Sequence, residues 1–136
     1  MRPKLGAIAV VVHDGQALLV QRRNPPNEGE WGFPGGHVER GETALEAAAR
    51  ELHEETGVIA TPTSYLTNVD VIGRDRHGVV TYHYLLAAVL CSYVSGDPVA
   101  DDDAMDAAWV PVSAVLSGDR PLSDNVAAVL NLAVQM

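Results

Sequence analysis

Three glutamates, Glu51, Glu54 and Glu55, follow one another in the chain at steps of three positions and then one. On a helix these steps place the three carboxylates on one face, where like charges repel by about 0.2–0.5 kcal/mol per pair. The triplet would also lie toward the helix C-terminus, where the helix dipole disfavours anions. Bound Mg²⁺ would offset both penalties, because this hard cation prefers carboxylate oxygens. The alternative is a solvated acidic face, which is the usual role of an isolated acidic triplet.

The residues around the triplet favour a metal site over a solvated face. Arg50 directly precedes Glu51, and Glu42 lies eight residues upstream of Arg50. An arginine in this place can hold a carboxylate in position, as metal-ligating side chains usually require. Farther upstream, Gly35 and Gly36 carry no Cβ atom, so their backbone carbonyls can approach a metal ion closely. Together these residues predict a carboxylate-based metal centre.

A helix over residues 43–56 is predicted to carry these carboxylates. Thr43 and Glu46 have the spacing of a capping box, and Gly57 is a favourable residue just after a helix. One face of this helix carries four apolar residues that we expect in the core: Leu45, Ala48, Ala49 and Leu52. The glutamates would then lie on a neighbouring face, accessible to a ligand.

The rest of the pattern predicts a sheet. Two apolar runs, at residues 7–12 and 17–20, flank Asp14-Gly15, which is a strong signal for a two-residue hairpin. Further strands are predicted at 31–33, 65–72, 79–94 and 109–110, helices at 111–116 and 123–135, a turn at Gly35-Gly36 and an acidic loop at 98–106. This order indicates an α+β fold with a mixed sheet, and a length of 136 residues suits one domain.

The composition disfavours several kinds of partner. The chain has 18 acidic and 9 basic residues and a formal net charge of −9, which argues against binding to nucleic acid or to an anionic membrane. Its apolar runs are too short to span a bilayer, and the N-terminus lacks the pattern of a secretory signal. Cys91 is the only cysteine and lies in an apolar run, so we expect a buried small residue rather than a nucleophile. A soluble, cytoplasmic protein is therefore expected.

The stretch from Gly36 to Val58 resembles the complete signature of the Nudix hydrolases. The matching residues, at the spacing of that family, are Gly36, Glu42, Arg50, Glu51, Leu52, Glu54, Glu55, Gly57 and Val58. The flanks also resemble the family, at Gln21-Arg22, at residues 31–36 and at 109–111. The resemblance covers most of the chain and indicates a single Nudix domain over residues 1–136, with its signature at 36–58.

This resemblance implies a fold, a reaction and a set of metal ligands. The family has an α/β/α sandwich around a central mixed sheet. Its members use Mg²⁺ or Mn²⁺ to hydrolyse a nucleoside diphosphate linked to another moiety. Glu51, Glu54 and Glu55 would be the carboxylate ligands. The Gly35 carbonyl would be a backbone ligand.

The resemblance also implies catalytic roles for Arg50, Glu51 and Glu54. Arg50 would orient Glu51, and Glu42 would pair with Arg50 rather than touch metal. Either Glu54 or Glu51 would accept a proton from the attacking water.

Substrate contacts are expected outside the signature. The family often places an arginine where Arg22 ends the second strand, and a guanidinium fork suits a phosphate. Arg23 would be a second contact or a solvated charge. Trp31 could stack on a base. Asp102 or Asp103 could complete the metal site, serve as the base or contact the substrate, or belong to a solvated acidic loop.

Two reaction types remain open for the substrate. Relatives that cleave ADP-ribose often carry a proline beyond the signature, whereas residues 71–75 here are Val-Ile-Gly-Arg-Asp. The chain still resembles the small bacterial group described as ADP-ribose pyrophosphatase-like, so hydrolysis of ADP-ribose or an NDP-sugar is the first prediction. The alternative is a nucleoside triphosphate pyrophosphatase of the mutator or housecleaning type.

A third hypothesis is a nucleotide-sensing module that binds without cleaving. It is disfavoured because all four glutamates of the signature are present. The expected partner is a small nucleotide-like diphosphate. The family also allows a homodimer, formed through the N-terminal strand or the C-terminal helix.

Overall fold

The computed structural model describes residues 2–24, 27–101 and 104–136, which form seven strands and three helices. The strands are β1 (Lys4–His13), β2 (Gln16–Arg22), β3 (Trp31–Gly32), β4 (Gly35–His37), β5 (Ile59–Arg74), β6 (Val80–Ser95) and β7 (Ala104–Pro111). The helices are α1 (Ala44–Thr56), α2 (Val112–Ser117) and α3 (Val126–Val134). Strands β3, β2, β1, β6 and β5 lie side by side in that order, while β4 pairs with β1 and β7 with β2. The β1–β6 pair is parallel and the others are antiparallel, so the sheet is mixed, as predicted.

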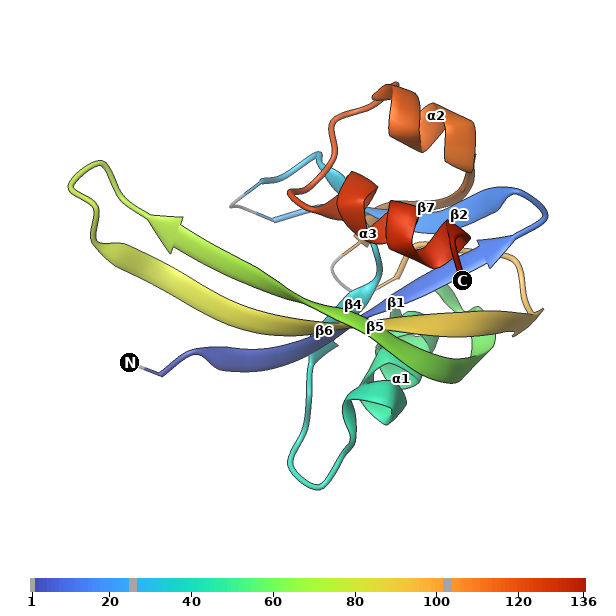
Figure 1. The fold of residues 1–136 in the computed structure, drawn as a ribbon, viewed down its shortest axis with the longest axis horizontal. Coiled ribbons are helices and arrows are strands. Elements are labelled where there is room, and N and C mark those ends of the chain that lie inside the picture. The colour runs from blue at the N-terminus through green and yellow to red at the C-terminus, as the bar shows by residue number, and fades with distance from the viewer. Residues whose placement is uncertain (1, 25–26, 102–103) are drawn as a thin grey trace.

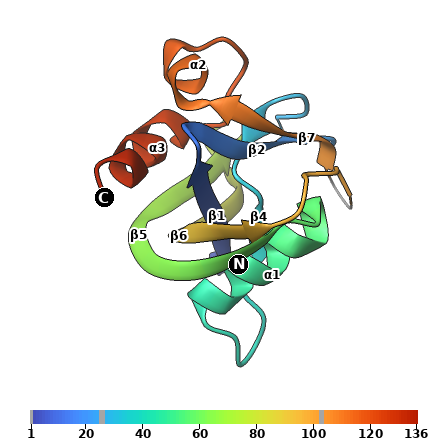
Figure 2. The ribbon, with the colours of Figure 1, turned by 90° about the vertical axis from the view of Figure 1, so that its right-hand side faces the viewer.

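Helices cover the sheet from both sides, with α1 on one side and α3 on the other (Figures 1 and 2). The core beside α1 includes Ala47, Ala48, Leu52, Val11 and Val89. The core beside α3 includes Val126, Val129, Leu130, Val10 and Val69. Neighbouring residues of β1, Val10 and Val11, thus point into different cores, as the alternation of a strand requires. The predicted α/β/α sandwich is confirmed.

The first hairpin forms at the predicted place. Asp14 and Gly15 have φ angles of 51° and 74°, and two positive φ values are what a two-residue turn of type I′ requires. His13 and Gln16 face each other across the turn. The hairpin sets the direction of β2, which ends at Arg22.

Helix α1 begins and ends as predicted. The Thr43 Oγ1 atom accepts a hydrogen bond from the Glu46 N–H at 3.1 Å, and the Thr43 N–H donates to the Glu46 side chain at 2.9 Å. Gly57 ends the helix in the left-handed conformation, with a φ of 75°. The buried face differs slightly from the prediction: Ala47 is fully buried, whereas Ala49 is only half-buried. The difference arises because α1 packs against both β1 and β5.

The predicted turn at Gly35-Gly36 is wrong, because both residues lie in β4. Gly36 pairs with Ala7 of β1, and Gly35 pairs with Ile8. A Cβ atom on Gly35 would lie 2.2 Å from the Ala7 carbonyl oxygen and 2.8 Å from the Ile8 Cα atom, so only glycine permits this approach. A glycine pair that is typical of a turn forms a strand here because of a partner distant in the sequence.

Two strands begin well before their predicted first residues. β5 begins at Ile59 rather than at Tyr65, and β7 begins at Ala104 rather than at Trp109. β7 therefore includes the last residues of the predicted acidic loop. Both extensions are paired with residues that are more than 25 positions away in the sequence, in β6 and β2 respectively. Pairing of this kind overrides the weak local signal of polar residues.

Two expectations from composition can be compared with the structure. Cys91 is buried, as predicted, and burial raises the pKa of its thiol to about 11. The thiol is therefore protonated at neutral pH and is a poor nucleophile. Within the described parts of the chain the longest helix has 13 residues, and no helix is long and apolar enough to cross a bilayer.

Replacing Thr43 with alanine is expected to lower the free energy of unfolding by about 1 kcal/mol, because the Glu46 N–H loses its capping acceptor. Thr43→Ser keeps a hydroxyl at the same place and should retain most of the stability. Urea denaturation followed by circular dichroism measures both variants. Equal losses in the two would show that the hydroxyl does not stabilise α1.

Candidate active site

The candidate site lies where the carboxylate face of α1 meets β4. A Cβ atom on Gly36 would lie 2.5 Å from the Glu51 Cδ atom and 2.6 Å from each carboxylate oxygen. The Glu51 carboxylate therefore lies against the Gly36 backbone, and only glycine leaves room for it. Just 15% of the Glu51 side chain is exposed. Gly36, the first residue of the signature, is thus in direct contact with Glu51 of α1.

Arg50 connects the carboxylates of this face. Its Nε and Nη2 atoms donate to the two oxygens of Glu42 at 2.7 and 3.1 Å, a two-pronged ion pair. Its Nη1 atom donates to Glu51 at 3.0 Å and to Glu54 at 3.1 Å, and its Nη2 atom also donates to the His37 carbonyl at 3.0 Å. Arg50 thus contacts both Glu42 and Glu51 in the structure, while its expected role in orienting Glu51 stays a prediction. The contact with Glu54 adds a third carboxylate.

The contacts between Arg50 and Glu42 stabilise the charged forms of both side chains. The hydrogen bond from Arg50, followed by one from the Glu39 N–H, holds the pKa of Glu42 below its usual range. The hydrogen bond to Glu42, followed by those to Glu54 and Glu51, raises the pKa of Arg50. One guanidinium faces four carboxylates, those of Glu39, Glu42, Glu51 and Glu54, so the acidic groups on this face outnumber the basic one. The face can therefore attract a cation.

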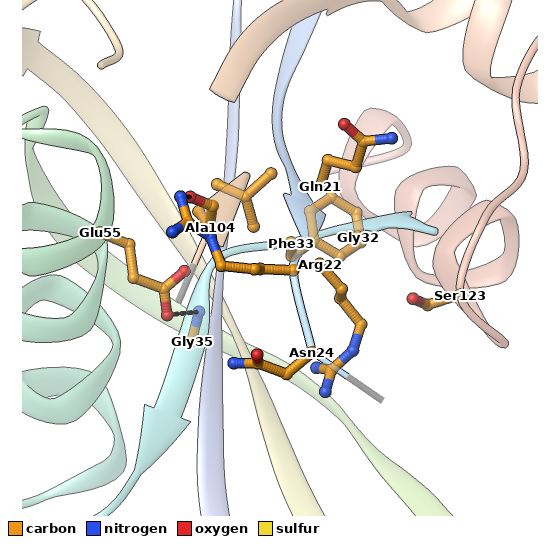
Figure 3. A pocket seen from close by; sticks show the side chains of 11 residues that line it. Gln21, Arg22, Asn24, Gly32, Phe33, Gly35, Glu55, Ala104 and Ser123 are labelled. Carbon is orange, nitrogen blue, oxygen red and sulfur yellow. Dashed lines mark hydrogen bonds between the residues drawn. The ribbon is translucent and has the colours of Figure 1, made fainter. Parts of the chain in front are cut away.

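Glu55 lies on the same side of α1 and extends toward Gly35 (Figure 3). Its Oε1 atom accepts a hydrogen bond from the Gly35 N–H at 3.3 Å. The structure thus brings Gly35 next to the glutamate triplet. The role of the Gly35 carbonyl as a metal ligand stays a prediction.

A pocket of about 180 Å³ adjoins Glu55. It is formed by the end of β2 and the residues after it, by β3 and β4, by the start of β7 and by the loop before α3. Arg22, Arg23 and Asn24 line it together with Glu55 (Figure 3). Arg23 also donates from Nη2 to the Ala104 carbonyl at 3.3 Å. Both arginines that the sequence proposes as phosphate contacts therefore lie at a pocket beside the carboxylate face.

Trp31 does not line this pocket. It is only 9% exposed and packs in the core beside α3. The Arg120 guanidinium lies 5.1 Å from the centre of the Trp31 ring and covers it. The expected stacking of Trp31 on a base has no support from this position, because the ring is almost fully buried.

Asp102 and Asp103 lie outside the described residues. Their neighbours on both sides are placed: the Asp101 N–H donates to the Glu55 carbonyl at 2.9 Å, and Ala104 lines the pocket. The roles of the two aspartates in the metal site, as the base or as substrate contacts stay predictions.

The donor atoms on this face of α1 fit a hard divalent cation. Glu51, Glu54 and Glu55 offer carboxylate oxygens, which Mg²⁺ and Mn²⁺ prefer. Among residues 2–24, 27–101 and 104–136, no three acidic, histidine or cysteine side chains are gathered closely enough to hold an ion as they stand. The carboxylates bind Arg50 and the Gly35 N–H instead. Long glutamate side chains on one helix face can turn from these partners toward a shared ion.

Two polar residues of the pocket, Asn24 and Ser123, are not predicted from the sequence. Asn24 belongs to a loop rich in proline and asparagine, and the sequence marks Ser123 only as the start of the terminal helix. Ser123 instead precedes α3, and its N–H donates to the Trp31 carbonyl at 2.9 Å. Polar residues are ordinary in such places, so only the nonlocal pairing reveals Ser123 as part of the pocket.

The sequence profile of the NUDIX domain matches residues 3–130. The chain belongs to the Nudix hydrolase family. It is 35% identical over 107 residues to a Methanocaldococcus jannaschii protein named ADP-ribose pyrophosphatase, and this match spans 79% of the chain but 61% of that protein. It is 32% identical over 120 residues to phosphatase NudJ of Escherichia coli K12, spanning 88% of the chain and 76% of that protein.

A solved Nudix structure shares the fold over nearly the whole chain. The NUDIX domain of Shewanella oneidensis NrtR, solved in complex with ADP ribose, superposes with a TM-score of 0.77 and is 26% identical. The match covers 99% of this chain and 88% of that one. The Nudix fold implied by the signature is thus confirmed.

Replacing Gly36 of the Nudix signature with alanine is expected to displace the Glu51 carboxylate, because the three closest neighbours of the added Cβ all belong to that group. The Glu51 side chain can swing away, so the variant should still fold. Its affinity for Mn²⁺, measured by electron paramagnetic resonance, should fall by about tenfold or more. Wild-type Mn²⁺ affinity in a folded Gly36→Ala variant would contradict the expected role of Glu51.

Proposed function

We propose that this protein is a hydrolase that uses Mg²⁺ or Mn²⁺ to cleave a nucleoside diphosphate linked to another moiety, with ADP-ribose or an NDP-sugar as its substrate. One observation carries the proposal: Arg22 and Arg23 line the same pocket as Glu55, beside the carboxylate face of α1. A diphosphate needs both cationic binding groups and an adjacent site for the attacking water. The relative named ADP-ribose pyrophosphatase and the NUDIX domain solved with ADP ribose support this substrate class.

The carboxylates of α1 would hold the divalent cation. Glu51, Glu54 and Glu55 would supply the side-chain ligands, and Gly35 a backbone carbonyl. Bound there, the cation would neutralise charge on the diphosphate and would lower the pKa of the attacking water. Arg50 keeps Glu51 in place through a hydrogen bond of 3.0 Å. Arg50 is therefore a positioning residue.

The two arginines at the end of β2 would bind the phosphates. A guanidinium presents several N–H groups in a rigid fork that matches the oxygens of a phosphate. Arg23 gives one N–H to the Ala104 carbonyl, which fixes the side chain and leaves other donors for the ligand. Arg22 lines the same pocket. The substrate would thus lie between these arginines and Glu55.

Glu54 is our candidate for the group that accepts the proton of the attacking water. Its side chain is 46% exposed, whereas Glu51 is 15% exposed and lies between Gly36 and Arg50. A general base must come within hydrogen-bond reach of water, which the more exposed carboxylate does more easily. Glu51 is the second candidate.

A nucleoside triphosphate pyrophosphatase of the mutator or housecleaning type is the second candidate function. Residues 71–75 lack the proline that is common in relatives that cleave ADP-ribose. One of the two relatives carries the different name phosphatase NudJ. Both reactions break a phosphoric anhydride bond, so the same arginines and carboxylates could serve either.

A cytoplasmic location and a homodimer complete the proposal. The one cysteine of the sequence, Cys91, is buried, which suits a reducing compartment. The N-terminal strand or the C-terminal helix would form the interface of the dimer.

A substrate panel tests the function. ADP-ribose, NDP-sugars, dNTPs, oxidised dGTP and diadenosine polyphosphates are incubated with the protein, with and without Mg²⁺. We expect Mg²⁺-dependent cleavage, fastest for ADP-ribose or an NDP-sugar. Glu54→Gln should lower kcat by about 100-fold or more, because it removes the general base. Asp70→Asn, which removes an exposed carboxylate of β5, is the matched control and should leave kcat unchanged. If no diphosphate is cleaved at any Mg²⁺ concentration, the protein is not this enzyme.

Divalent cation should also stabilise the fold. Mg²⁺ that binds the native carboxylates shifts unfolding by mass action, and about a hundredfold excess over Kd contributes about 2.7 kcal/mol. The melting temperature should therefore rise by several degrees between a chelator-treated sample and one with millimolar MgCl₂. KCl at matched ionic strength is the control. The rise should shrink in Glu51→Gln, and an unchanged wild-type melting temperature would contradict a metal site.

A further inference from the structure

The pocket beside Glu55 has a second side that lies away from the carboxylate face of α1. In Figure 3, Glu55 and Ser123 lie on opposite sides of the pocket, and Gly32 and Phe33 lie toward Ser123. The carboxylate face and its cation would occupy the side of Glu55. The side of Ser123 is therefore available for one end of the substrate.

Ser123 is fixed in this wall by backbone pairing with β3. The Trp31 N–H donates to the Pro121 carbonyl at 2.9 Å, and the Ser123 N–H donates to the Trp31 carbonyl at 2.9 Å. A Cβ atom on Gly32 would lie 3.3 Å from the Ser123 Oγ atom, so glycine at this position leaves space beside the hydroxyl. The hydroxyl oxygen faces the pocket in Figure 3. A positioned hydroxyl of this kind can select a substrate group.

The size of the pocket limits what it can hold. Its volume is about 180 Å³, whereas sites that enclose a drug-sized ligand measure about 300–1,000 Å³. This volume is that of a small part of a nucleotide. The pocket can take a single ring, with the rest of the substrate outside it.

The lining favours a hydroxylated ring over a nucleobase. Bases are commonly held by stacking on an open aromatic face. Trp31 and Phe33 are each 9% exposed and belong to the core, and Arg120 covers the Trp31 ring. Asn24 and Ser123, in contrast, carry side chains that both donate and accept hydrogen bonds. Sugar hydroxyls have the same dual character, so they match this lining.

We propose that this side of the pocket receives the sugar linked to the outer phosphate of the substrate, and that Ser123 is a specificity-determining residue that hydrogen-bonds one of its hydroxyls. The inference rests on the proposed function, because the diphosphate at Arg22 and Arg23 sets the position of the sugar. It goes further by making the sugar, not the base, the recognised group.

Kinetics with a constant sugar and a changing base test the inference. KM and kcat are measured for ADP-glucose, UDP-glucose and GDP-glucose, and for dATP, which carries no outer sugar. Ser123→Ala should raise KM by about fivefold for all three NDP-glucoses, the effect of one neutral hydrogen bond. It should leave kcat nearly unchanged and have no effect on dATP.

Two further variants separate recognition from stability. Ser123→Thr keeps the hydroxyl and should restore a KM near the wild-type value. Ser117→Ala removes an exposed hydroxyl of α2 that bonds to the Ala114 carbonyl, and it should behave as wild type. Thermal melting of each variant shows that it is folded.

A binding measurement makes the outcome independent of turnover. The probe is a methylene-bridged analogue of ADP-glucose, in which carbon replaces the bridging oxygen, and calorimetry gives its Kd with wild type and with Ser123→Ala. A Kd about fivefold weaker in the variant supports the inference, and an equal Kd overturns it. A KM effect that changes with the base, or that extends to dATP, also overturns it, because the base would then occupy the pocket. If wild type cleaves none of the substrates, the proposed function fails while the two Kd values still decide the role of Ser123.

Discussion

The guanidinium of Arg50 joins the three parts of the chain that form the site. It donates to Glu42 in the segment before α1, to the His37 carbonyl in β4 and to two glutamates of α1. Carboxylates one helical turn apart would otherwise repel each other and destabilise the C-terminal half of the helix. Arg50 reduces that repulsion without cancelling it, because one positive charge faces four carboxylates. The helix can therefore fold with these carboxylates on one face, and the remaining negative charge favours a cation.

The two adjacent glycines of β4 couple this helix to the sheet, each for a different reason. Gly35 lets β4 approach the backbone of β1, since a Cβ atom there would lie 2.2 Å from the Ala7 carbonyl oxygen. Gly36 leaves space for the Glu51 carboxylate on the other side of the strand. A larger residue at the first position would separate β4 from β1, and one at the second would push away the carboxylate. The position of the site relative to the sheet thus depends on glycine, which has no side chain, at both positions.

Local signals predict the parts of this protein whose conformation is decided locally. Asp14-Gly15 predicts its hairpin and Thr43 with Glu46 predicts the start of α1, because turn and cap geometry involve only nearby residues. The signature, through the family it resembles, predicts the pairing of Arg50 with Glu42. Gly35-Gly36 looks like a turn in isolation and becomes a strand only because β1 lies beside it. A similar reason explains why Ser123 lines the pocket and Trp31, which the sequence proposes as a substrate contact, does not. Backbone pairing between these distant segments places the tryptophan in the core and the serine at the pocket.

The net charge of −9 is a property of the whole chain, whereas the site depends on the charges of a few neighbouring groups. Long polyanions contact a wide surface and would meet its overall negative charge, so they remain poor partners. A diphosphate contacts only a few groups, and the lining of this pocket includes two arginines, Arg22 and Arg23. A cation held by the α1 carboxylates would add positive charge on the opposite side. Part of the acidity that repels large anions is thus the same set of carboxylates that would help to bind a small one, and the sign of the interaction changes with the size of the ligand.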